Sequence, residues 1–359
     1  MSEKPIIGIT MGDPAGNGPE ITVKALAHAD LYDRCRPLVV GDAKMIEQAA
    51  RFVGRPDMKI HRCEKVSDAL FTPGTIDVLH MELIPDAAAF ELGKVSVAGG
   101  NAAFQCVKKV IELAMAGEVD ATCTNALNKE AMNKALEADG GAHSDGYTHF
   151  DGHTEIYATY THTKKYTMML AHHDLRVVHV STHCSLREAC DRVKKARVLE
   201  VIEIAHQACK DMGIAQPRVA VAGLNPHCGE NGMFGTEEIE EIQPAIDAAL
   251  AEGINIPEKK PTPPDTVFSK ALGGWYDIVV VMYHDQGHIP LKVKGFVYNK
   301  EEKHWEAVAG VNVTLGLPII RASVDHGTGF GHAGSGHANE LSLVNAMDYG
   351  IRLAENRKA

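Results

Sequence analysis

Short apolar runs alternate with amphipathic stretches along almost the whole chain of 359 residues. The runs are typical of buried strands. The amphipathic stretches, in which apolar residues recur at helical spacing, are typical of helices. Strands are expected over 5–11, 37–41, 76–81, 119–124, 166–170, 175–180, 217–222 and 278–282, and helices over 21–28, 43–52, 96–116 and about 188–212. This alternation predicts an α/β fold with a largely parallel sheet that carries helices on both faces.

Three segments interrupt the alternation. Residues 137–155 are rich in turn formers, histidine and aspartate, and we expect them to form a substrate lid or a crossover between domains. Residues 256–265 contain four prolines and predict a stiff connection between domains. Residues 299–309 are charged and are expected to form an exposed loop. A chain of this length has room for about two domains.

Histidines follow three of the expected strands within a few residues of the carboxyl end: His183, His227 and His284. In open α/β sheets, ligands bind outside the carboxyl ends of the strands. Three imidazoles at one edge match the ligand chemistry of Zn²⁺, Co²⁺, Mn²⁺ or Fe²⁺, although any one such histidine is more often structural. Asp265 and Asp285 could orient a ligand histidine, and roles as caps or turn formers suit them equally well.

Three further polar residues, Lys292, Asn312 and Arg321, also lie close to strand ends. The two cations suit a phosphate or a carboxylate, and arginine can bind either with two hydrogen bonds. The alternative is a solvated surface charge, which fits Arg321 less well because apolar residues surround it in 317–324. Residues 12–20 form a glycine-rich turn before a helix, which indicates either an anion site or a tight turn.

Composition narrows the function classes. The net charge of −11 and the pI near 5.9 argue against a general nucleic-acid or anionic-membrane surface. The eight cysteines are scattered without a C-x-x-C pair, and no apolar run approaches membrane-spanning length. With no signal peptide at the first residues, the chain is expected to be cytoplasmic with reduced thiols.

Six blocks of the chain, taken together, are specific enough to indicate a protein family: 12–20, 152–155, 181–183, 224–227, 283–287 and 321–328. They resemble the signature blocks of the 4-hydroxythreonine-4-phosphate dehydrogenase (PdxA) family. They occur in family order and span residues 5 to about 350. Within the family, residues 128–130 and 288–292 are more similar to the branch that acts on 4-phospho-D-threonate or 4-phospho-D-erythronate.

The resemblance implies two α/β/α domains with a cleft between them, similar to isocitrate and isopropylmalate dehydrogenases. It implies a homodimer that shares its active sites, with metal ligands His183, His227 and His284 and one of the three contributed across the dimer. The expected domains are 1–130 plus 290–359, which carries a nucleotide loop, and 131–289, which carries the metal ligands and the dimer interface.

By the same resemblance, individual residues acquire roles. Catalytic roles fall on Lys292, Asp265 and Asp285; substrate binding on His153, Thr154, Lys292, Asn312 and Arg321; and cofactor binding on His326, Gly327, Thr328, Gly334 and Asn339. The loop that holds the cofactor residues departs from the family pattern at Gly329, Gly331, His332 and His337. The choice between NAD and NADP therefore stays open, as does the choice of Zn, Mg, Co or Mn.

The expected function is metal- and NAD-dependent oxidation, with decarboxylation, of a 4-phosphorylated 3-hydroxy acid such as 4-phospho-D-threonate. One alternative is oxidation of 4-phosphohydroxy-L-threonine in pyridoxal phosphate synthesis, and another is oxidation of a cis-dihydrodiol carboxylate. A catalytically silent ligand-binding protein is the alternative from a different class. The expected partners are a small phosphorylated substrate and a second copy of the chain, with no nucleic acid and no membrane.

Overall fold

The chain forms two compact α/β units. The computed structural model describes residues 3–301, 304–308 and 310–358. Unit 1 contains the chain up to Thr163 together with Leu317–Lys358, and unit 2 is Lys164–Gly316. The sequence also predicted a first domain that resumes near the C-terminus, with domain boundaries at 130 and 290. In the structure the boundaries between the units lie after 163 and before 317.

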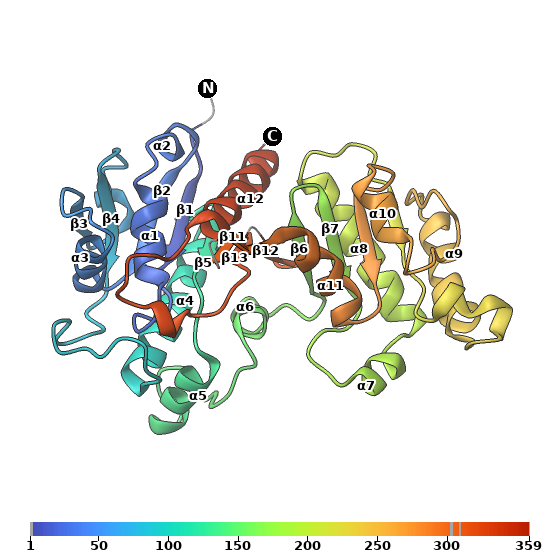
Figure 1. Cartoon of the computed structure of the whole chain (residues 1–359), viewed down its shortest axis with the longest axis horizontal. Helices are drawn as coiled ribbons and strands as arrows, with labels where there is room; N and C mark the ends of the chain where they lie inside the picture. The colour runs from blue at the N-terminus through green and yellow to red at the C-terminus, as the bar shows by residue number, and fades with distance from the viewer. Residues whose placement is uncertain (1–2, 302–303, 309, 359) are drawn as a thin grey trace. The chain divides into compact units, whose positions relative to one another are not determined.

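Unit 1 contains six parallel strands, four of which lie in the apolar runs predicted at 5–11, 37–41, 76–81 and 119–124; β3 and β13 were not predicted. Their order is β3 (Lys59–Cys63), β4 (Thr75–His80), β2 (Arg36–Gly41), β1 (Ile6–Thr10), β5 (Ala121–Thr124) and β13 (Arg321–Val324) (Figure 1). The strand β13 comes from the returning segment of the chain, so Arg321 lies at the start of a strand that pairs with β5.

Helices cover both faces of this sheet. An added Cβ on Gly8 of β1 would lie 2.7 Å from Val110 of α4 (Val97–Met115), so Gly8 faces α4. Its neighbour Ile7 approaches Gly350 of α12 (Leu341–Lys358). Because successive strand residues point to opposite faces, α4 and α12 lie on opposite sides. The helices α1 (Gly18–Leu26) and α3 (Ala43–Phe52) accompany α12, and α5 (Lys129–Ala138) and α6 (His153–Tyr160) accompany α4.

Unit 2 combines antiparallel and parallel pairing. Its strands follow the order β12 (Val311–Leu315), β6 (Thr167–His172), β7 (Leu175–His179), β9 (Ile278–Val281) and β8 (Val219–Val221). Strand β6 is antiparallel to both neighbours, whereas β7, β9 and β8 are parallel. The carboxyl ends of these three strands therefore share one edge of the sheet.

Apolar side chains of unit 2 pack helices onto its strands. Val177, Val279 and Val281 join Val267 of α10 (Val267–Leu272) and Leu291 of α11 (His284–Gly295) in one buried cluster. The long helix α8 (Lys195–Asp211) also contacts β7, β8 and β9, and α9 (Gln243–Ala251) packs on α8. The predicted site residues stand at the carboxyl edge of the strands, in the loops after β7 and β8 and at the start of α11.

The predicted interdomain connection at 256–265 is wrong, because these residues lie inside unit 2. Thr262 donates from its amide to the carbonyl of Val221 at 2.8 Å and accepts from the amide of Gly223 at 3.0 Å. Proline stiffens a segment but does not prevent the residue beside it from pairing with an edge strand such as β8.

Other local predictions also differ from the structure. The helix expected over 188–212 is divided into α7 (Leu186–Asp191) and α8, and the 137–155 loop ends in the first turn of α6. Instead of a loop over 299–309, β10 (Phe296–Asn299) and β11 (His304–Val308) pair as a hairpin. Residues 302, 303 and 309 of that prediction lie outside the described residues. Among the residues described, no helix is both long and apolar enough to cross a membrane.

Candidate functional site

Three of the predicted ligands follow three adjacent parallel strands of unit 2. Strand β9 lies between β7 and β8, and Val280 pairs with a residue of each neighbour. His183 follows β7, His284 follows β9 and His227 follows β8, so all three come from the same edge. The rings of His183 and His284 have their centres 6.0 Å apart. Apolar runs followed by polar residues were sufficient to predict this placement.

Two buried side chains tie these strand ends together. Gln286 accepts a hydrogen bond from the amide of Met282 and donates to the carbonyl of Gly223, both at 2.7 Å. Ser181 donates from its hydroxyl to the carbonyl of Met282 at 3.0 Å. The three strand ends are thus fixed beside one another before any ligand binds.

The backbone around His227 adopts an uncommon conformation. His227 and Cys228 have φ values of 52° and 56°, in the left-handed region that side chains other than glycine rarely occupy. The carboxylate of Glu238, which is buried, accepts the amides of Leu224 and Asn225 at 2.7 Å each and holds the entry to this turn. Such strain of about 1–3 kcal/mol per residue persists only where surrounding contacts enforce it, and it clusters at functional sites.

The helix α11 presents a face of chemistry-bearing residues. His284, His288 and Lys292 recur every four positions, which places them on one face. The ring of His288 stacks on that of His284 at 3.5 Å between centres. The Nδ1 of His284 lies 2.7 Å from Asp285 Oδ1, an arrangement in which that nitrogen donates and Nε2 is left for a ligand.

Two histidines that the sequence did not single out belong to this region: His288, on the face itself, and His179, beside it. His179 is fully buried, its ring centre is 4.9 Å from that of His288, and its Nε2 has no hydrogen-bond partner within the described structure. Burial lowers the pKa of His179 to about 4 and that of His288 to about 3, so both are neutral near pH 7. The four-residue spacing of His288 from His284 could have revealed it, whereas nothing in the sequence distinguishes His179, the last residue of the buried strand β7, from a structural histidine.

The donor set fits a divalent metal ion in its chemistry. Neutral imidazoles are suitable ligands for zinc and similar ions, and a hydrogen-bonded carboxylate beside one of them orients its ring. Two imidazoles on one tetrahedral ion have ring centres roughly 5 Å apart, which is near the separation of His183 and His284. His227 does not complete a group with them. Among the described residues, only His61, Cys63 and Asp77 bring three such ligand atoms within 4.8 Å of one another.

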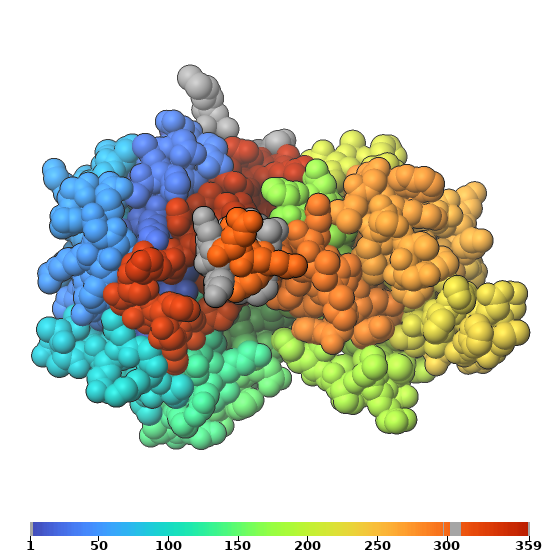
Figure 2. Space-filling view, in the orientation of Figure 1, coloured from blue at the N-terminus to red at the C-terminus, as the bar shows by residue number. Residues whose placement is uncertain are grey.

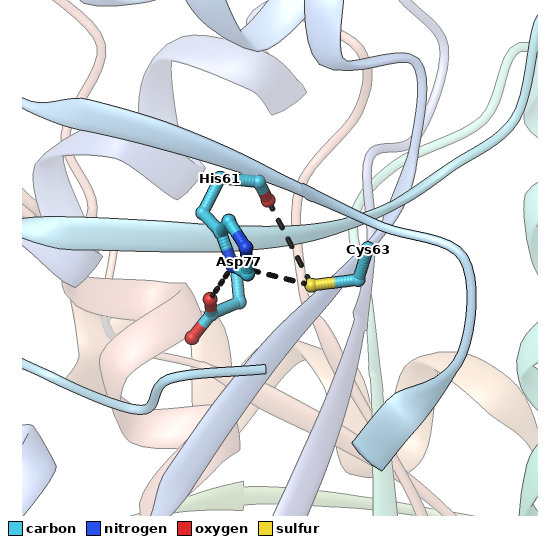
Figure 3. A group of neighbouring side chains, drawn as sticks. All are labelled: His61, Cys63 and Asp77. Carbon is cyan, nitrogen blue, oxygen red and sulfur yellow. Dashed lines mark hydrogen bonds and ion pairs between the residues drawn. The ribbon is translucent and has the colours of Figure 1, made fainter. Parts of the chain in front are cut away.

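That group lies in unit 1 and is explained by hydrogen bonding (Figure 3). His61 and Asp77 are paired across β3 and β4, and His61 Nδ1 lies 2.7 Å from Asp77 Oδ1. Two ligand atoms on one tetrahedral zinc are about 3.3 Å apart, so this pair is too close to share an ion. Asp77 also accepts the amides of Leu70 and Phe71, and therefore closes the turn before β4.

The predicted substrate residues of unit 1 include one buried cation, Arg321, and the partly buried His153 and Thr154. The side chain of Arg321 is 2% exposed, donates to Thr124 Oγ1 at 3.0 Å and lies over the ring of Tyr157. Burial lowers the pKa of Arg321 to about 10, so it keeps its charge near pH 7. His153 Nε2 and Glu155 Oε2 are buried without a hydrogen-bond partner inside the described ranges. Thr154 stands between these two residues at the start of α6.

Burial also acts on His153. Burial first, and then the charges of Arg321 and Lys129, lower the pKa of His153 well below its usual value. A cation and a neutral imidazole with an unused ring nitrogen are suited to bind an anion such as a phosphate. Lys129 approaches the same place, because an added Cβ on Gly152 would lie 3.5 Å from its Cε.

The remaining predicted substrate and catalytic residues lie in unit 2. Asn312 on β12 donates from Nδ2 to the sulfur of Met168 at 3.0 Å, and Lys292 Nζ lies 4.6 Å from the ring centre of Phe296. Asp265 is exposed, and its charge contributes to a raised pKa of Cys228, which places it near the turn that carries His227.

The predicted cofactor residues lie between β13 and α12 in unit 1. His326 Nδ1 lies 2.9 Å from the carbonyl oxygen of Gly327, and Asn339 accepts the amide of Leu341 at the start of α12. The carbonyl of Thr328 accepts the amide of Asn17 at 2.8 Å, and the amide of Gly334 is bound by a side chain of α1. The glycine-rich turn at 12–20 therefore contacts this loop.

Comparison with known proteins agrees with this architecture. The family "Pyridoxal phosphate biosynthetic protein PdxA" matches residues 33–350. A D-threonate 4-phosphate dehydrogenase of Cupriavidus necator is 45% identical over 354 residues, which cover 98% of each chain. The protein of the same name from Salmonella typhimurium is 45% identical over 353 residues, which cover 98% of this chain and 100% of that one.

A solved structure is similar over the same length. The crystal structure of a 4-hydroxythreonine-4-phosphate dehydrogenase from Burkholderia phymatum has a TM-score of 0.80 and 44% identity, and covers 98% of this chain and 99% of that one. Sequence family, full-length relatives and fold agree with the resemblance found in the sequence blocks. The chain belongs to the PdxA family of dehydrogenases.

Proposed function

We propose that this protein oxidises and decarboxylates 4-phospho-D-threonate, or the closely similar 4-phospho-D-erythronate, with NAD or NADP as the oxidant. The observation that carries the proposal is the 45% identity, over nearly the full length of both chains, to a protein named D-threonate 4-phosphate dehydrogenase. In unit 1, the buried Arg321 and the unpartnered Nε2 of His153 agree with a substrate that bears a phosphate and a carboxylate.

Each unit offers groups suited to bind a substrate anion, and the chemistry differs between the two. In unit 1, the Arg321 guanidinium can donate two parallel hydrogen bonds to an anion, and His153 Nε2 and the Thr154 hydroxyl stand in the same unit. In unit 2, Lys292 offers a mobile point charge and Asn312 a neutral amide donor. Binding energy from a remote phosphate can then lower the barrier at the reacting carbon.

His183, His227 and His284 would hold a divalent cation, for which Zn, Mg, Co and Mn are candidates. The bound cation would polarise the substrate hydroxyl and lower its pKa. Asp285 would orient His284 through its hydrogen bond to Nδ1, and Asp265 stands near the His227 turn. The resemblance indicates that one ligand comes from a partner subunit, which agrees with a His227 that does not join the other two within one chain.

The reaction requires a proton acceptor and a hydride acceptor. Lys292 shares a helix face with His284 and is the candidate base that takes the hydroxyl proton. The nicotinamide ring would take the hydride from C3, which removes two electrons and leaves a ketone beta to the carboxylate. The bond between C2 and the carboxyl carbon then breaks and CO₂ leaves. The electron pair of that bond stays with C2 and forms an enolate, which is protonated to the product ketone.

A second candidate substrate is 4-phosphohydroxy-L-threonine, which has an amine at C2 where the first has a hydroxyl. Glu155 favours this candidate, because its Oε2 is buried without a hydrogen-bond partner in the described structure and could accept from an ammonium group. The charge of Arg321 also interacts with the Glu155 carboxylate.

The test is NADH or NADPH formation with all three phosphorylated acids, each with divalent metal and with EDTA. Metal-dependent turnover of a phospho-sugar acid is the expected result. Preference for the amino acid would assign the chain to pyridoxal phosphate synthesis instead. No turnover of any phosphorylated acid, together with turnover of a cis-dihydrodiol carboxylate, would overturn the proposal. Absence of NAD or NADP binding in calorimetry would indicate a catalytically silent protein.

A further inference from the structure

The segment 325–340 of unit 1 is held by one buried carboxylate. The side chain of Glu20 on α1 is 2% exposed and accepts the backbone amides of Gly334 at 2.5 Å and Gly336 at 2.7 Å. Each carboxylate oxygen takes one amide. Figure 2 shows this segment, in red, at the surface of unit 1.

The two amides can meet one carboxylate because glycine occupies both positions. Gly334 and Gly336 have φ values of +83° and +72°, which residues other than glycine rarely adopt. At Gly336, an added Cβ would also lie 2.2 Å from the carbonyl oxygen of Phe52. Successive backbone amides in such turns form anion-binding concavities, and here the anion is supplied by the protein itself.

α1 and the residues that flank it make further contacts with this segment. Glu20 and Lys24 are four positions apart within α1, as residues on one helical face are, whereas Asn17 precedes the helix and His28 follows it. The amide of Asn17 donates to the carbonyl of Thr328 at 2.8 Å, and Lys24 Nζ donates to the carbonyl of Ala338 at 2.7 Å. His28 Nε2 lies 3.1 Å from Glu340. α1 and its flanking residues therefore hold the segment at both ends and in the middle.

We propose that Glu20 is a positioning residue that sets the affinity for the nicotinamide nucleotide by holding the 325–340 segment in its binding conformation. The inference rests on the proposed function, with NAD or NADP as the oxidant, and on the family resemblance, which implies that residues of this segment bind the nucleotide. Glu20 itself cannot be a ligand of the nucleotide, because it is buried and both its oxygens are used. A loop that is ordered before binding loses less conformational freedom when the nucleotide binds.

The sequence offered two interpretations of residues 12–20, an anion site or a tight turn. The structure adds a third role: Glu20, the acidic residue at the end of this stretch, holds a loop much later in the chain. Its two hydrogen-bond partners lie 314 and 316 residues after it. Affinity for the nucleotide then depends on a contact that no nucleotide atom touches.

The test is Glu20→Gln in the full-length protein. Glutamine keeps one acceptor oxygen and places an NH₂ group against the second amide, so one hydrogen bond to a charged group is lost. We expect the Kd and the KM for NAD⁺ to rise about tenfold. The kcat at saturating NAD⁺ and the KM for the phosphorylated acid should stay within about twofold, because this bond touches neither. Hydrogen exchange of the amides over 333–337 should accelerate.

Two further variants complete the design. Glu47→Gln on α3 removes an exposed carboxylate that pairs with Arg62 at 3.0 Å, and should change neither nucleotide affinity nor loop exchange. Lys24→Met removes the bond to Ala338 and should change both in the same direction as Glu20→Gln, which keeps the inference testable if that variant does not fold. If Glu20 only stabilised the fold, the variant would have a lower free energy of unfolding, but its KM for NAD⁺ would not rise while its kcat stayed constant.

The two possible failures are distinguishable by calorimetry. If the unmodified protein binds neither NAD⁺ nor NADP⁺, the proposed function fails and this inference fails with it. If the unmodified protein binds a nucleotide and both Glu20→Gln and Lys24→Met bind it within twofold of that affinity, only the inference is overturned.

Discussion

Gln286 Nε2 donates a 2.7 Å hydrogen bond to the carbonyl oxygen of Gly223, which joins the carboxyl ends of β9 and β8. Gly223 leads directly into the turn that carries His227, and Gln286 stands two residues after His284. One amide side chain thus relates the positions of two predicted metal ligands that are far apart in the sequence.

Replacing this side chain by methionine should weaken metal binding and stability together. Gln286→Met keeps a similar volume but leaves the Met282 amide and the Gly223 carbonyl buried without partners. Each such group costs about 1–3 kcal/mol. We expect urea unfolding to show a loss of unfolding free energy of that order, and Zn²⁺ titration to show at least tenfold weaker metal binding. The exposed Gln207→Met on α8 is the control, and equal zinc affinity in both variants would contradict the role.

The three histidines themselves allow a test of the shared site. Each single variant, His183→Ala, His227→Ala and His284→Ala, should lose metal and activity together, because three ligands are needed to retain the ion. If one ligand comes from a partner subunit, mixing two variants by unfolding and refolding should restore one intact site per mixed dimer. That predicts about a quarter of normal activity in two of the three pairs. Recovery in none of the pairs would mean that all ligands belong to one chain.

The sequence could predict the strand ends of unit 2 because the signals are local. An apolar run followed by Tyr283 and His284 is visible in a short window, and the parallel pairing of β7, β9 and β8 then brings the ends together. The same window suggested a loop after the strand, whereas α11 begins at His284 and contains Pro290. That proline weakens any helical prediction, so the face shared with His288 was not recognised.

Contacts between distant segments could not be predicted in the same way. Nothing near Glu20 in the sequence indicates that its partners are Gly334 and Gly336, since that pairing follows from the return of β13 and α12 to unit 1. Likewise, the prolines at 256–265 suggested a linker, and only the position of β8 at the edge of its sheet shows that Thr262 pairs there.

Arg321 should be essential for binding the substrate anion, and its charge alone should not be sufficient for this role. Arg321→Lys keeps a cation but loses the planar donor pair and the stacking on Tyr157. We expect the KM for the phosphorylated acid to rise by about 10- to 100-fold, as the loss of a buried charge-assisted hydrogen bond predicts. Inhibition by inorganic phosphate should weaken in parallel. Arg62→Lys, at an exposed ion pair, should change neither quantity, and an unchanged KM in Arg321→Lys would remove this residue from the binding site.

The pH dependence of stability should carry a signature of Asp13. This carboxyl is 1% exposed, and burial raises its pKa to about 6 although the amides of Ala15 and Asn128 act in the opposite direction. The folded state therefore binds a proton more tightly than the unfolded state, whose pKa stays near 3.8. Stability from this group is full below the unfolded pKa and is lost as the pH rises through the folded pKa.

Asp13→Asn removes that titration, because asparagine has no ionisable proton. Between pH 5 and pH 8, Asp13 should cost the unmodified protein about 1.4 kcal/mol of unfolding free energy. The variant should lack this loss, so the difference between the two proteins should move in favour of the variant as the pH rises. Urea unfolding at several pH values measures it, with the exposed Asp33→Asn as the control for removing one carboxylate. Parallel curves for Asp13→Asn and the unmodified protein would show that Asp13 is ionised at pH 5, in spite of its burial.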